Sequence, residues 1–104
     1  MGIRGHFCKQ YIIEFGVAYG WDELESCLLS IERYCDEHLD DHYLLSWDEN
    51  LGYVEMILEY FNQIDLEDLR QYLTKEQGEI LDSIIEYAKM PQNAKNGYIR
   101  IEVF

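Results

Sequence analysis

Apolar residues recur at three- and four-residue spacings along most of this chain, a pattern that predicts a mainly helical protein. The clearest case covers residues 22–39, where Leu24, Leu28, Ile31 and Cys35 fall on one helical face. Asp22 precedes this stripe and is a suitable N-cap. The spacing therefore predicts an amphipathic helix over 22–39.

A second helix is predicted from Trp47 to about residue 62. The motif "SWDE" places Ser46 at a cap position and Glu49 three residues later, which matches a capping box. The apolar stripe that follows consists of Trp47, Leu51, Val54, Leu58 and Phe61. Gly52 lies away from that stripe and weakens the helix by about 1 kcal/mol relative to Ala.

Two further cap signals and one alternating segment complete the pattern. Asp65 starts a short helix, and Thr74 with Gln77 starts a longer one that ends before Pro91. In "GYIRIEVF", residues 97–104, apolar and charged residues alternate, which predicts a strand.

A lone strand needs a partner for its backbone groups, and residues 11–15 are the nearest candidate. Residues 7–15 fit a helical face and a strand about equally well. We therefore predict one domain over 1–104, mainly α with some β (α+β): four to five helices and a small two-stranded sheet formed by the N- and C-terminal segments. The alternative is an all-α bundle whose C-terminal strand forms a dimer.

The distribution of charged residues indicates more about function than the overall composition does. The net charge is −13, and no Lys or Arg occurs between Arg33 and Arg70. That window contains eleven carboxylates: Asp36, Glu37, Asp40, Asp41, Asp48, Glu49, Glu55, Glu59, Asp65, Glu67 and Asp68. Such a chain repels nucleic-acid phosphates and anionic lipids, and it attracts basic proteins. Helix caps account for some of these acids but do not explain the missing cations.

The predicted helix from Trp47 would place several of these acids beside tyrosines on its outer side. Tyrosines among carboxylates suit a protein-binding surface, although a neighbouring element of the fold could equally cover them. The predicted partner-binding residues are Asp36, Glu37, Asp40, Asp41, Asp48, Glu49, Tyr53, Glu55, Glu59 and Tyr60.

His38 and His42 are spaced as two metal ligands on a helix would be, but Leu39 stands where a metalloprotease motif has Glu. They are therefore weak metal candidates, and we expect neither a metal nor a cofactor. The three cysteines favour buried, reduced thiols. With no signal peptide and no apolar stretch of membrane-spanning length, these features predict a cytoplasmic protein.

These features predict a non-enzymatic inhibitor that binds and occludes a basic partner. The expected partner is a nuclease toxin, as for bacterial immunity proteins, or a nuclease defence complex, as for phage inhibitors. Neither direct nucleic-acid binding nor membrane binding is expected, and the chain could be a monomer or a homodimer. The alternatives are an adaptor module, possibly homodimeric, and a metal-dependent enzyme at the two histidines.

Overall fold

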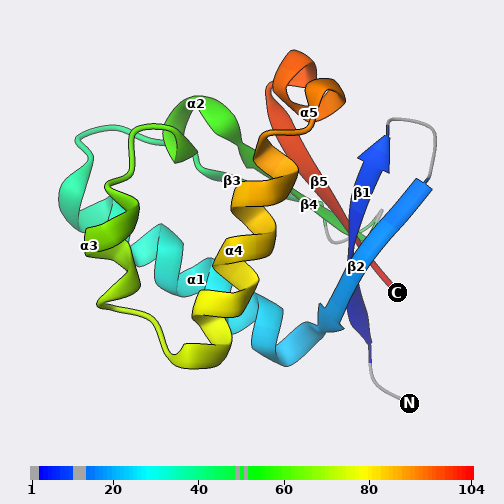
Figure 1. Ribbon diagram of the computed structural model, residues 1–104, viewed down its shortest axis with the longest axis horizontal. Coiled ribbons are helices and arrows are strands. Elements are labelled where there is room, and N and C mark those ends of the chain that lie inside the picture. The colour runs from blue at the N-terminus through cyan, green and yellow to red at the C-terminus, as the bar shows by residue number, and fades with distance from the viewer. Residues whose placement is uncertain (1–2, 11–13, 49, 51) are drawn as a thin grey trace.

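The protein is built from five strands and five helices in the part of the chain that the computed structural model describes, residues 3–10, 14–48, 50 and 52–104 (Figure 1). The strands are β1 (Arg4–Gln10), β2 (Glu14–Gly20), β3 (Leu45–Asp48), β4 (Tyr53–Ile57) and β5 (Tyr98–Val103). The helices are α1 (Trp21–His38), α2 (Leu58–Phe61), α3 (Leu66–Arg70), α4 (Lys75–Ala88) and α5 (Pro91–Asn96).

All five strands form one antiparallel sheet in the order β2-β1-β5-β4-β3. Helices α1 and α4 pack against each other on one side of it, as Figure 1 shows. Sheet residues such as Phe7, Val54 and Ile99 meet Leu28 of α1 and Ile84 of α4 in a single buried cluster. The fold is therefore a two-layer arrangement of helices on an antiparallel sheet.

The predicted fold class, mainly helical with a two-stranded sheet, is wrong. The first and last strands do lie side by side, with Gly5 opposite Val103 and Phe7 opposite Ile101. However, β4 pairs with the other side of β5, so β5 occupies the centre of a wider sheet. A central strand has both edges hydrogen-bonded, so the alternative of a dimer-forming C-terminal strand is wrong as well.

The predicted pairing of the C-terminal strand with residues 11–15 also differs from the structure. Residues 11–13 lie outside the described part of the chain, and β2, which begins at Glu14, pairs with β1 rather than with β5. The segment that does pair with β5 is Gly5–Phe7, one strand earlier in the sequence.

The predicted helix from Trp47 is a β-hairpin followed by one short helical turn. Trp47 and Val54 stand opposite each other in the β3–β4 ladder. A seven-residue separation places two residues on one side of a helix, but here it also places them across a hairpin. Gly52 lies in the turn with φ +73, a conformation that favours glycine. Ser46, the predicted cap, lies within β3.

Most of the other local helix signals are confirmed. The exception is Asp22, which is not the N-cap: α1 begins at Trp21, its N-cap is Gly20, and no side chain caps it. The predicted helix over 22–39 is α1, and the Asp65 side chain accepts a hydrogen bond from the Asp68 amide at the start of α3. At the start of α4, both hydrogen bonds of the capping box between Thr74 and Gln77 are present.

Candidate functional site

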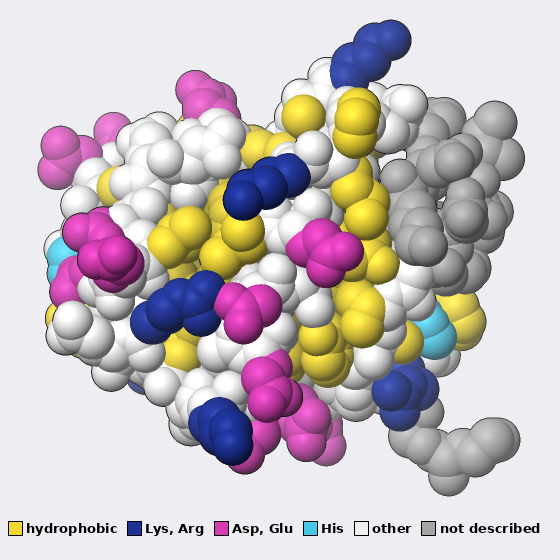
Figure 2. Space-filling model, viewed as in Figure 1, with side chains coloured by type: hydrophobic (Ala, Val, Ile, Leu, Met, Phe, Trp, Pro, Cys, Tyr) yellow, Lys and Arg dark blue, Asp and Glu magenta, His cyan; other side chains and the backbone are white. Residues whose placement is uncertain are grey.

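Exposed carboxylates gather where α1 ends, at the end of the molecule that α2 and α3 also form. We call this surface the acidic end. It comprises Asp36, Glu37, Asp40, Asp41, Glu59 and Glu67, all of which are exposed. Figure 2 shows carboxylate side chains grouped at the left of the molecule, over the region where Figure 1 places α3.

His42 holds the parts of the acidic end together. Its Nε2 lies 2.6 Å from a carboxylate oxygen of Asp36, and its ring meets that of Tyr60 edge-on at 6.5 Å. The Leu44 amide donates to Nδ1, so the ring proton of the neutral form is on Nε2 and points at Asp36. The loop after α1 is thereby fixed both to that helix and to α2.

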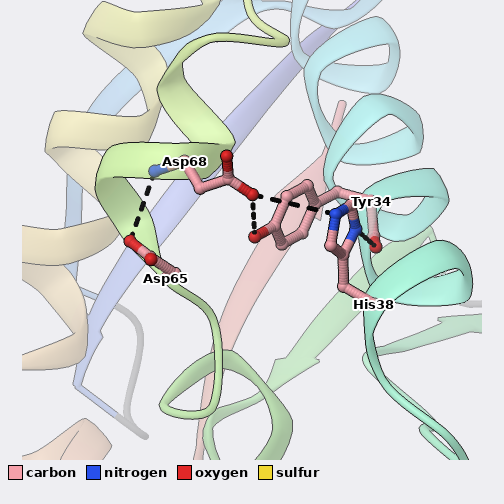
Figure 3. A network of polar contacts seen from close by, with 4 residues as sticks. All are labelled: Tyr34, His38, Asp65 and Asp68. Carbon is pink, nitrogen blue, oxygen red and sulfur yellow. Dashed lines mark hydrogen bonds and ion pairs between the residues drawn. The ribbon is translucent and has the colours of Figure 1, made fainter.

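His38 belongs to a different network, which ties α1 to α3 (Figure 3). Its Nδ1 donates to the Tyr34 carbonyl at 2.9 Å, and its Nε2 lies 3.7 Å from Asp68. The Tyr34 hydroxyl donates to the same carboxyl group at 2.8 Å, and its ring stacks on His38 at 4.0 Å. Burial, followed by the bond to Asp68, raises the pKa of Tyr34 to about 12. The hydroxyl therefore stays protonated as a donor.

The structure does not bring His38 and His42 together as a metal pair. Helix α1 ends at His38, so His42 lies in the following loop rather than one helical turn further on. Each ring faces its own carboxylate, and a metal would have to displace the Leu44 amide to reach Nδ1 of His42. Within residues 3–10, 14–48, 50 and 52–104, no group of three or more metal-ligating side chains is positioned to bind an ion.

Of the other predicted site residues, Tyr60 lies on α2 beside His42, whereas Asp48, Tyr53 and Glu55 lie on the sheet. Glu55 and Tyr53 project from β4 beside Arg100 of β5, and Asp48 ends β3. Trp21 at the start of α1 packs on Trp47 of β3, whereas His38 is the last residue of that helix, so the tryptophan pair and the acidic end lie at opposite ends of α1. Glu49 lies outside the described residues.

Arg100 neutralises part of the predicted anionic surface. Its guanidinium lies 3.8 Å from the centre of the Tyr53 ring, 2.9 Å from Glu102 and 3.5 Å from Glu55. Burial lowers the pKa of Arg100, but the hydrogen bond and charge of Glu102, followed by Glu55, raise it overall. Because these carboxylates already have a cation, they contribute less to attracting a partner than the exposed acids do.

Sequence reasoning missed two features. The first is Tyr43, which is 66% exposed and follows the acids Asp40 and Asp41. The polar segment "DDHY" could have indicated an exposed tyrosine beside carboxylates. Trp47, which belongs to a predicted apolar stripe, instead meets Trp21 edge to face at 5.9 Å and is 38% exposed. That pairing depends on strand order, which local spacing does not reveal.

The three cysteines are buried and unpaired by disulfides, as predicted. Burial raises the pKa of Cys27 to about 12. It also raises the pKa of Cys35, with smaller contributions from Asp36 and Glu32, to about 11. A thiol protonated at neutral pH is a poor nucleophile, so these groups are structural.

No helix in the described part of the chain combines the length and apolar character needed to cross a membrane. No family model matches the sequence, and comparisons with curated proteins and with solved structures give no match. The function must therefore be argued from the surface itself.

Proposed function

We propose that the protein is a non-catalytic inhibitor whose acidic end binds and covers the nucleic-acid-binding surface of a basic partner protein. The partner would be a nuclease toxin or a nuclease defence complex, encountered in the reducing cytoplasm. The observation that carries this proposal is the set of exposed carboxylates at the acidic end, in a 36-residue stretch of sequence without Lys or Arg.

Carboxylates suit this role because a nuclease must present cationic groups to bind phosphates. Opposite charges accelerate encounter, and contacts that exclude water then slow dissociation. Tyr43 offers a large ring, 66% exposed, beside Asp40 and Asp41, and tyrosine is a common anchor in protein interfaces. His42 fixes the loop that carries these groups, which lowers the entropy cost of binding.

A homodimeric adaptor could have buried Tyr53 and Tyr60 of the predicted helix from Trp47 against a second copy. That helix does not form. Tyr53 instead lies on β4 under Arg100, and Tyr60 lies on α2 against the core. The inhibitor reading does not require either tyrosine to be free.

The test compares two variants of equal charge. In the first, Asp40→Asn, Asp41→Asn and Glu59→Gln neutralise the acidic end. In the control, three exposed acids of α4, Glu76, Glu79 and Glu86, are changed to Gln. Both variants carry a net charge of −10 instead of −13.

Each protein is used as bait in lysate of the source cell at low salt, and the affinity of a captured basic nuclease is then measured with purified proteins. We expect the acidic-end variant to bind at least about tenfold more weakly and to inhibit nuclease activity less, whereas the control changes affinity by less than about threefold. Equal losses in the two variants would show that only net charge matters. Capture of no basic nuclease, or affinity insensitive to salt, would contradict the proposal.

A further inference from the structure

A recess of about 230 Å³ opens between the start of α1 and the tip of the β3–β4 hairpin. It lies at the other end of α1 from the acidic end. Two tryptophans, Trp21 and Trp47, form part of its wall with their ring planes at 78° to each other. Glu25 supplies a carboxylate from α1, and Asp48, Gly52, Tyr53 and Val103 complete the lining.

The size and lining of this recess limit its ligand. It is smaller than the roughly 300–1,000 Å³ of typical small-molecule sites, so it suits one side chain rather than a nucleotide or an organic cofactor. Aromatic faces combined with a carboxylate favour a cation. A larger hollow of about 690 Å³ also borders Trp21, but Arg4 lines it, so that hollow already carries a positive charge.

The chain itself shows how such a set of groups binds a guanidinium. On the face of the sheet opposite to the buried Val54 and Ile101, Arg100 lies over the Tyr53 ring while its nitrogens contact two carboxylates, Glu55 and Glu102. Guanidinium suits this combination because it is planar and weakly hydrated, so it can stack on a ring while its edges donate to carboxylates. An ammonium group is a compact, strongly hydrated charge and gains less from the rings.

We propose that the recess between Trp21 and Trp47 binds an arginine side chain of a partner protein, with the guanidinium on the indole rings and hydrogen bonds to Glu25. That the arginine comes from the inhibited partner rests on the proposed function, whereas guanidinium binding itself does not. Glu25 is half-exposed on α1, and the structure assigns it no hydrogen bond or ion pair with another described residue. It can therefore turn towards an incoming cation without losing a partner.

Intrinsic fluorescence tests this directly, because the chain contains only two tryptophans and both line the recess. The probe is N-acetyl-arginine amide, titrated into the intact protein at constant ionic strength. The comparison probes are N-acetyl-citrulline amide, which has nearly the same shape without the charge, and N-acetyl-lysine amide. We expect a saturable change in emission with the arginine probe, and at least about tenfold weaker binding of the other two.

Two variants locate the effect. Glu25→Gln should weaken the arginine probe by about fivefold. Glu32→Gln removes the same charge from a half-exposed position two helical turns further along α1, away from the recess, and should leave its affinity within about twofold of wild type.

The proposal is overturned if the arginine probe gives no saturable change, if citrulline or lysine matches it, or if Glu25→Gln and Glu32→Gln behave alike. This assay needs no partner protein. Failure to capture a nuclease would therefore contradict the proposed function while leaving the recess as a guanidinium site. A titration without a fluorescence change would contradict the guanidinium site while leaving the proposed function in place.

Discussion

A substitution at Gly5 tests a feature of the fold that sequence patterning did not predict, the packing of the interior strand β1 against α1. An added Cβ at Gly5 would lie 2.1 Å from Cδ2 of Leu24 and 3.3 Å from Cγ2 of Ile101. Carbon atoms in contact are normally about 3.5–4.0 Å apart. Both neighbours are buried, with 0% and 1% of their surface exposed, so Leu24 cannot swing into solvent to relieve the overlap.

Gly5→Ala should therefore destabilise the protein. Overpacking of a dense core costs about 1–3 kcal/mol, and for a domain of this size 2 kcal/mol corresponds to a fall in Tm on the order of 10 °C. Gly78→Ala is the matched control, because nothing lies within 4 Å of a Cβ at that helical position. It should stabilise the protein by about 0.5–1 kcal/mol, so the two substitutions should have opposite signs.

A double-mutant cycle identifies the neighbour. Leu24→Ala alone should cost about 2–5 kcal/mol by leaving a cavity. The alanine at position 5 then fills part of that cavity, so the double variant should cost about 1 kcal/mol or more less than the sum of the single changes. Urea unfolding followed by tryptophan fluorescence and circular dichroism measures all four free energies. A Gly5→Ala protein as stable as wild type, or additive effects in the cycle, would refute this packing of β1 on α1.

Three further predictions use the same unfolding assay. Gly52→Ala should lower the free energy of unfolding by about 1–2 kcal/mol, because φ is +73 in the hairpin turn, and an unchanged value would contradict that turn. Thr74→Ala should cost about 1 kcal/mol by removing the cap of α4, whereas Thr74→Ser should retain most of it. The free energy of unfolding should also fall as the pH rises from about 9 towards 11–12, because thiols such as Cys27 ionise in the unfolded chain before they do so in the fold. Replacing Cys27 with Ala should reduce that slope, and an unchanged slope would show that other groups cause it.

The parts of the fold that the sequence predicted are those specified by residues close together in the chain. The stripe through Leu24, Leu28 and Ile31 and the caps at Asp65 and Thr74 each depend on neighbours within a turn or two, and all of them are present. The failure at Trp47 has a physical cause of the same kind. Its seven-residue separation from Val54 is compatible with a helix face and with a hairpin pair, and the choice depends on β5, more than forty residues later.

In the candidate site, too, the features set by residues close together in the chain were predicted, and those set by long-range strand pairing were not. The acids Asp40, Asp41 and Glu59 lie together at one end and are exposed, and this required only that short connections keep neighbouring segments close. The contacts of Glu55 and Tyr53 with Arg100 could not be predicted, because the pairing of β4 with β5 brings these residues together. Long-range pairing therefore determined which predicted acids keep their negative charge uncompensated.

The acidic end and the tryptophan recess would affect different stages of binding. Glu25 lies roughly 20 Å from His38 along α1, more than twice the Debye length of about 8 Å at physiological salt, so neutralising Glu25 changes the field at the acidic end little. Exposed acids mainly change the association rate, whereas one desolvated arginine contact mainly changes the dissociation rate. If a single partner covers both surfaces, Asp40→Asn with Asp41→Asn should slow association in a salt-dependent way, and Glu25→Gln should speed dissociation at all salt concentrations. Finding both effects on the same rate constant would show that the two surfaces do not act as separate contacts.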